Sequence, residues 1–155
     1  MGQIGNAGTA WNTKSENLMF TQEGGLAIRM INKTGAASIK GSVVELEGTT
    51  DKGVELSGIG SPDPIGIIYD SGIADGDFVW VVVSGFAEVL YSTAVTRGTF
   101  ARVPDSGDTS GTAGQAIAEP LPSPPFASDK HFQEIGHPAE SIGSPGLALT
   151  VLHFN

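Results

Sequence analysis

Short hydrophobic segments separated by turn residues dominate the chain from residue 26 onward. Apolar and polar positions that alternate with a period of two are typical of half-buried strands, and Gly, Pro, Asn and Asp between such segments are typical of turns. The pattern predicts strands at residues 26–32, 38–47, 54–57, 65–69, 78–91, 100–103, 132–137 and 147–154. We therefore predict an all-β fold, either a small β-barrel or a β-sandwich.

The longest predicted strand contains a segment, Phe78 to Val83, that is apolar at every position. Such a strand is covered on both faces or lies in a subunit interface, because an exposed one would promote aggregation. Gly85 follows it midway along the strand, and a glycine at this place indicates a bulge or bend. A bend lets a sheet curl, which favours a small closed or nearly closed barrel.

Two segments lack the two-residue alternation of apolar and polar positions that is typical of strands. Residues 1–25 carry isolated large side chains among Gly and Asn, and we predict an extended N-terminal arm that docks onto a neighbouring subunit; a frayed terminus is the alternative. Residues 105–128 are rich in Gly and Pro and predict a long surface loop within a single β-domain, residues 26–155. The candidate interface residues in these segments are Trp11, Leu18, Phe20, Pro122, Pro124 and Phe126.

Composition and charge narrow the possible functions. With 22 Gly, 9 Pro and only 16% charged residues the chain does not resemble a helical bundle, and 39% hydrophobic residues argue against disorder. The net charge of −9, without a cluster of bases, argues against nucleic acid and anionic membranes as partners. No apolar run exceeds six residues and no leader is evident, so we expect a soluble protein made in the cytoplasm.

Candidate metal ligands gather near the end of the chain, at His131, Glu134, His137 and His153. Imidazole and carboxylate groups suit zinc, but the spacing is not that of the helical zinc-protease motif. On a regular strand His131 and His137 would lie on one face and Glu134 on the other. We therefore interpret the histidines as hydrogen-bonding or interface residues and predict no metal.

Other candidate metal ligands and catalytic residues have less support in the sequence. Asp70, Asp75 and Asp77 lie among glycines, but their order does not match a calcium-binding loop, and we interpret them as turn residues. Serines lack the strand–turn–helix context of a nucleophile, and there is no cysteine for a thiol nucleophile, a disulfide or a Cys-based zinc site. We predict no enzyme activity and no cofactor.

A series of short strand-and-turn motifs carries a family resemblance. The motifs are residues 32–38 with Gly41, Val43 and Val44, then 74–77, 79–85, 87–90, 96–98, 131–137, 140–141 and 152–155. Together they resemble tailed-bacteriophage capsid decoration (head cement) proteins, over roughly residues 31–155. The resemblance implies a virion protein that binds the outer surface of the phage head and reinforces the shell. The implied partners are the major capsid protein and copies of the chain itself, as a homotrimer.

Two arginines and three aromatic residues bear on the alternatives. Under the resemblance Arg97 and Arg102 would contact an acidic capsid surface; otherwise they lie on a solvated face or form a salt bridge to Glu88. A second hypothesis is a carbohydrate-binding β-module for host-surface attachment, with Trp11, Trp80 or Tyr91 as a stacking platform. A third is a small hydrolase that uses the terminal histidines.

Overall fold

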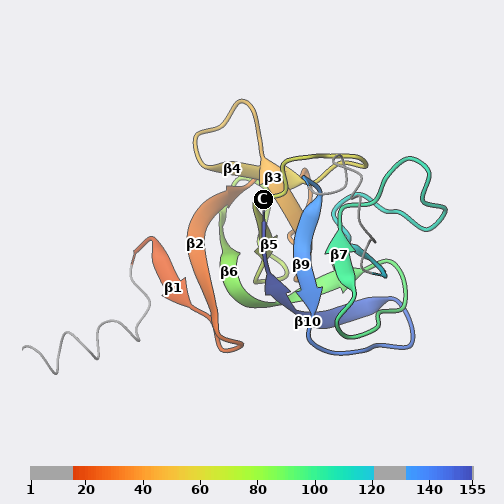
Figure 1. Cartoon of the computed structure of the whole chain (residues 1–155). Coiled ribbons are helices and arrows are strands. Elements are labelled where there is room, and N and C mark those ends of the chain that lie inside the picture. Colours follow the sequence, from red (N-terminus) through yellow and green to blue (C-terminus); the bar gives the residue numbers. More distant parts are fainter. Residues whose placement is uncertain (1–15, 121–131, 155) are drawn as a thin grey trace, which may run out of the picture.

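A computed structural model describes residues 16–120 and 132–154, and the all-β class predicted from the sequence is confirmed (Figure 1). The strands are β1 (Leu18–Phe20), β2 (Gly25–Asn32), β3 (Val43–Leu46), β4 (Gly53–Leu56), β5 (Gly66–Ile68), β6 (Phe78–Tyr91), β7 (Phe100–Arg102), β8 (Ile117–Glu119), β9 (Glu134–Pro138) and β10 (Gly146–Leu152). The sequence pattern anticipated all of these except β1 and β8. No helix in the described ranges has the length and apolar character needed to cross a membrane.

Five strands form a closed ring. β2 pairs antiparallel with β6 and parallel with β4, while β3 lies between β4 and β5, and β5 pairs with β6. Each of the five strands contributes to one buried apolar cluster, which identifies the interior of the ring. This cluster consists of Met30, Val44, Val54, Ile68, Val79 and Val81.

The ten strands form one continuous sheet, and the long strand β6 belongs to two parts of it, the ring and a second part that we call the second sheet. Its first half pairs with β2 and β5, and its second half, from Gly85, pairs with β10. Between the halves the register with β2 shifts, so that Val83 has no partner on β2. Gly85 has φ +80°, and a Cβ there would lie 2.5 Å from the carbonyl oxygen of Gly24. The predicted bend at Gly85 is therefore confirmed, and only glycine fits it.

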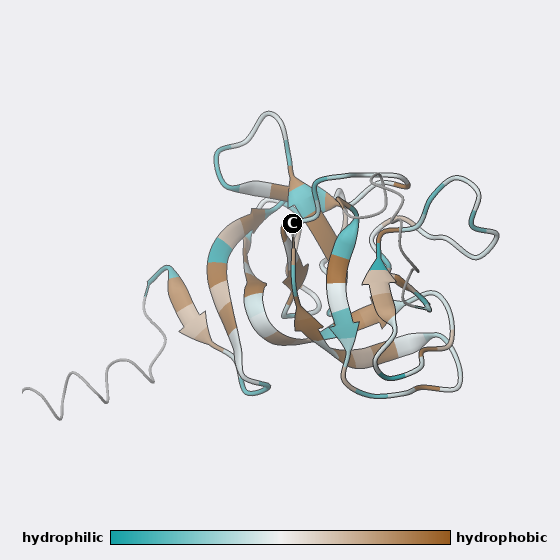
Figure 2. Ribbon diagram, viewed as in Figure 1, coloured by the Kyte–Doolittle hydropathy of each residue, from teal (hydrophilic) through white to brown (hydrophobic). Residues whose placement is uncertain are grey.

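The second sheet continues from β6 through β10, β9 and β7 to β8. A bridge between Ala116, just before β8, and Tyr91, at the end of β6, brings the far edge of this sheet back to its start. Buried residues of this sheet, such as Val89, Tyr91 and Ile135, share a second core with residues of the ring. Figure 2 shows that hydrophobic residues are concentrated on the strands, whereas most loop segments are hydrophilic or neutral.

Alternate residues of the apolar segment in β6 enter different cores. Val79 and Val81 point into the ring, while Trp80 and Val82 pack between the ring and the second sheet, and all four are buried. The prediction that both faces are covered is thus confirmed for these four residues. The two ends of the segment differ: Val83 is half-buried, and Phe78 is 55% exposed, with the Arg29 guanidinium 4.2 Å from its ring centroid.

Candidate interaction surface and histidine cluster

The structure describes only the last part of the predicted arm. Residues 1–15, which include Trp11, lie outside the described residues, and so does the segment 121–131 with Pro122, Pro124 and Phe126. Residues 18–20 form β1, which pairs antiparallel with residues 26–28 of β2. This part of the arm therefore lies on the chain's own sheet, which the missing alternation had not indicated.

β1 is the last strand at one edge of the sheet, and β2 is its one strand neighbour in the described part of the chain (Figure 1). The Thr21 N–H donates to Gly25 O at 2.8 Å, and the Arg29 N–H donates to Asn17 O at 3.1 Å. Because bonded and non-bonded residues alternate along an antiparallel ladder, the N–H and C=O of Phe20 point away from β2. The N–H and C=O of Phe20 therefore face outward from the edge of the sheet.

The side chains of β1 add apolar surface to this edge. Phe20 is 51% exposed, Leu18 is also exposed, and both lie on the same face of the strand pair as their register partners Leu26 and Ile28. Met19 points to the opposite face and packs against the second core. We call the side chains of Leu18 and Phe20, together with the outward-facing N–H and C=O of Phe20, the β1 edge.

The two candidate arginines have different surroundings. Arg97 is exposed and forms no ion pair with a described residue, so it remains a candidate contact residue. Arg102, in contrast, is buried on β7. The alternative of a salt bridge to Glu88 is wrong for both, because Glu88 pairs with Lys40.

Arg102 is enclosed by acids from the segment that follows its own strand. Nη1 and Nη2 lie 2.8 and 3.1 Å from the two carboxylate oxygens of Asp108, and Nη2 lies 3.0 Å from Glu119 Oε2. Burial lowers the pKa of the guanidinium, but the hydrogen bonds to Asp108 and Glu119 outweigh it and leave the pKa above its ordinary value. The expectation that Arg102 contacts a capsid is therefore replaced by a structural role, ordering residues 103–119.

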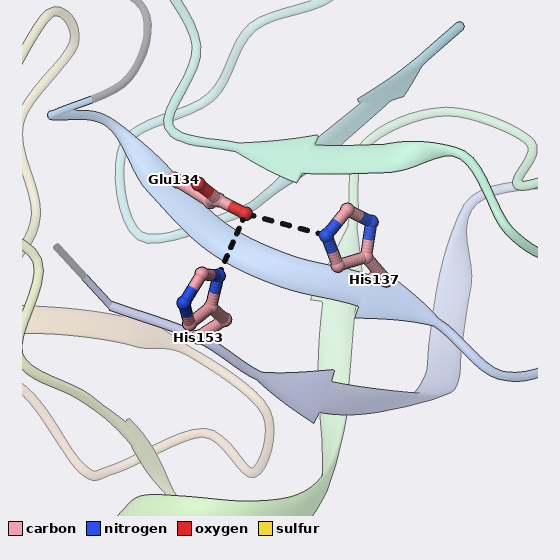
Figure 3. Close-up of side chains that lie close together, drawn as sticks. All are labelled: Glu134, His137 and His153. Atoms are coloured by element: carbon pink, nitrogen blue, oxygen red, sulfur yellow. Dashed lines mark hydrogen bonds and ion pairs between the residues drawn. The ribbon is translucent and has the colours of Figure 1, made fainter. Parts of the chain in front are cut away.

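Glu134, His137 and His153 form a cluster on β9 and at the end of β10 (Figure 3). Glu134 Oε1 lies 3.4 Å from His137 Nε2 and 3.2 Å from His153 Nδ1. The Glu134 carboxylate is buried, while the imidazoles of His137 and His153 are 42% and 63% exposed. The fourth candidate, His131, lies outside the described residues.

The expectation that Glu134 and His137 lie on opposite faces of a strand is wrong. Ala101 and Arg102 of β7 pair with Gly136 and Glu134, so the strand has one extra residue, Ile135, at this place. A bulge of this kind changes which face the following side chains occupy. The bulge requires glycine at position 136, because a Cβ there would collide with the main-chain oxygen of Val151 in β10.

The acids weighed for calcium serve as turn residues where the structure shows their contacts. Asp75 accepts a hydrogen bond from the Gly35 N–H at 2.8 Å and lies 3.7 Å from Lys33 Nζ. Among the described residues, Glu134, His137 and His153 form a group of three potential metal ligands, to which Asp70 and Asp77 do not belong.

Two of the three aromatic residues proposed to stack on a sugar lie in the described part of the chain. Trp80 and Tyr91, proposed as sugar-stacking residues, are buried. A wide, open depression beside β3, lined in part by Leu46, Ile59 and Ile65, lacks the enclosure that small-molecule sites usually have. The stacking residues required by the carbohydrate-binding alternative are therefore not available at positions 80 and 91.

Comparison with known proteins gives likenesses among solved structures alone. Protein-family models give no match to the chain, and curated proteins give none either. The solved structure described as the crystal structure of head fiber gp8.5 N base in bacteriophage phi29 superposes on 82% of this chain and 92% of its own. The TM-score is 0.48 and the sequence identity is 14%. A likeness of this size transfers neither a function nor a residue role.

Proposed function

We propose that this chain is a non-enzymatic structural protein of a bacteriophage head, a decoration protein that docks through the β1 edge. The observation that carries the proposal is an edge strand that combines an outward-facing main chain at Phe20 with a half-exposed phenylalanine side chain. Edge strands are usually short, charged or covered, because an open edge recruits further strands. A short edge strand with the exposed apolar side chains Leu18 and Phe20 therefore suits a protein that binds another chain.

The mode of binding follows from this geometry. A strand of the partner can add to the β1 edge through main-chain hydrogen bonds, and the apolar side chains then become buried in the contact. Full burial of an exposed phenylalanine contributes about 1.5–3 kcal/mol, and Phe20, which is 51% exposed, can gain about half of this, which is modest for a single copy. Many copies on a shell, or copies joined as a homotrimer, bind together much more strongly than one.

The partner comes from the sequence resemblance to head decoration proteins, which implies the major capsid protein and neighbouring copies of the chain, on the outside of the virion. The phi29 likeness adds no weight, because its TM-score is too low. A net charge of −9 fits a surface component that contacts neither nucleic acid nor an anionic membrane. Arg97, exposed on the loop after β6, is a described base that an acidic partner surface could meet.

The experiment is co-sedimentation of the full chain with heads assembled from the major capsid protein of the genome that encodes it. Phe20→Ser removes the apolar side chain, and Phe20→Pro in addition removes the outward N–H without breaking a bond to β2. Leu46→Ser is the matched control, because Leu46 is 60% exposed but lies on a strand paired on both sides.

We expect both Phe20 variants to bind at least tenfold more weakly than the parent and Leu46→Ser to bind like the parent. Equal binding by all four proteins would refute the β1 edge, and absence of binding by the parent would refute the capsid partner. Deletion of residues 1–15 tests the remaining part of the arm separately, because it leaves β1 in place.

The homotrimer is tested on the free protein by size-exclusion chromatography with light scattering. We expect a mass of three chains, each of 15.9 kDa. A monomer over a wide concentration range would restrict self-association to the assembled shell.

A further inference from the structure

Three potential ligand atoms lie close together in the Glu134–His137–His153 cluster, with the Glu134 carboxylate next to both imidazoles (Figure 3). Glu134 Oε1 lies 3.4 Å from His137 Nε2 and 3.2 Å from His153 Nδ1, and all three atoms are within 4.8 Å of one another. Nitrogen and oxygen ligands of tetrahedral zinc lie about 2.0–2.2 Å from the ion, which places them about 3.3–3.5 Å from each other. The two measured separations from the carboxylate oxygen therefore fit a single ion with small adjustments.

The other nitrogen of His137 determines which atom faces the carboxylate. Its Nδ1 lies 3.1 Å from the carbonyl oxygen of Thr99, which can only accept a hydrogen bond, so Nδ1 carries the proton. In a neutral His137 the Nε2 lone pair then faces Glu134 Oε1, which is also an acceptor. A metal ion placed between these two acceptors, which lie 3.4 Å apart, would be coordinated by both. Hydrogen bonding of the distal N–H to a carbonyl is, in addition, the usual arrangement of metal-binding histidines.

The backbone holds the cluster in this arrangement. The bulge at Ile135 turns Glu134 and His137 to one face, and Gly136 permits the close approach of β10 that brings His153 beside them. The His153 N–H donates to Ile135 O at 2.8 Å, which fixes the end of β10 next to the bulge. The three side chains thus come from main-chain positions that are hydrogen-bonded or paired, and the site requires no large rearrangement.

We propose that Glu134, His137 and His153 bind one divalent ion of the zinc class through Oε1, Nε2 and Nδ1. Mixed imidazole and carboxylate ligands suit zinc better than calcium or magnesium, which prefer oxygen alone. The carboxylate supplies a buried negative charge, and the exposed imidazoles give the ion access from solvent. Three protein ligands leave the fourth position to water.

The test is calorimetric titration of Zn²⁺ into the full chain, after treatment with a chelator and its removal, at pH 7.5. We expect one ion per chain. Glu134→Gln and His153→Gln should each weaken binding at least tenfold, because loss of an outer-shell partner alone commonly weakens metal sites 10- to 100-fold. Asp51→Asn, which removes an exposed carboxylate on the β3–β4 turn, should bind like the parent. His153 is exposed beyond the end of β10, so its variant should keep the fold, as the melting temperature will show.

Nuclear magnetic resonance of the imidazole nitrogens separates a metal from a proton. Saturating Zn²⁺ should shift His137 Nε2 and His153 Nδ1 while His137 Nδ1 keeps its proton. Absence of binding, unchanged nitrogen resonances, or equal affinity in the His153→Gln, Glu134→Gln and Asp51→Asn variants would overturn the proposal. The titration uses the free protein, so its outcome does not depend on capsid binding.

Discussion

Replacement of Arg102 by methionine tests what holds the long segment between β7 and β8. The Arg102 side chain is 2% exposed and donates hydrogen bonds to both carboxylate oxygens of Asp108, to Glu119 Oε2 and to the carbonyl oxygen of Val103. Asp108 in turn accepts a hydrogen bond from the Asp105 N–H at 2.6 Å. One guanidinium therefore organises both the turn after β7 and the end of β8.

The size of the effect follows from what methionine leaves behind. Its side chain fills much of the space of the arginine stem, but Asp105, Asp108 and Glu119 then lose the guanidinium that they share. Removal of one partner from a buried ion pair costs about 3–5 kcal/mol. The three carboxylates are 24–35% exposed and can turn partly toward water, so we expect the lower end, about 3 kcal/mol. Asp108→Asn keeps the shape and the second acid, and should cost about 1–3 kcal/mol.

The assay is urea unfolding of the full chain at pH 7, followed by circular dichroism. Arg97→Met is the matched control, because Arg97 is exposed and substitutions at such positions change stability by about 0.5 kcal/mol or less. If Arg102→Met proves as stable as Arg97→Met, the buried ion cluster does not order this segment and the reasoning is refuted.

Three further predictions concern buried groups. Burial raises the pKa of Tyr91, whose hydroxyl lies 2.8 Å from Thr150 Oγ1, so its contribution to stability is complete below the ordinary tyrosine value of 10.0 and is lost as pH rises above it. Urea unfolding at pH 8 and at about pH 10.5 should therefore show a smaller alkaline loss in Tyr91→Phe than in the parent. Asn32→Ala should lower the free energy of unfolding by about 1–3 kcal/mol, because the buried amide donates to two carbonyl groups and accepts from Thr34. Gly136→Ala should lower the melting temperature well below that of Gly143→Ala, which has open space around it; equal melting temperatures would contradict the bulge geometry.

Much of the fold was predictable because hydrophobic periodicity is a local property. The apolar run in β6 required cover on both faces, and Gly85 required a bend, whatever the rest of the chain does. β1 was not predictable in the same way, since three residues are too few for a period and its pairing depends on β2. The same glycine argument applied to Gly136 would have indicated the bulge in β9.

The candidate sites show the limit of spacing arguments. Counting along a regular strand separates Glu134 from His137, but the extra residue opposite β7 puts them together, and β10 adds His153 from far along the chain. The sequence suggested a surface position for Arg102. Its acidic partners Asp108 and Glu119 follow β7 in the chain, and the sequence does not show that this segment folds back onto Arg102.

The sequence by itself determined an all-β chain, the position of most strands, the covered segment of β6 and its bend at Gly85, because these depend on side-chain alternation and on backbone freedom at single residues. The tertiary structure decided the closure of the five-stranded ring, the edge position of β1, the burial of Arg102 and the meeting of Glu134 with His137 and His153. These features depend on which strands pair, on where a ladder gains a residue and on side-chain contacts between segments, and a local pattern specifies none of the three.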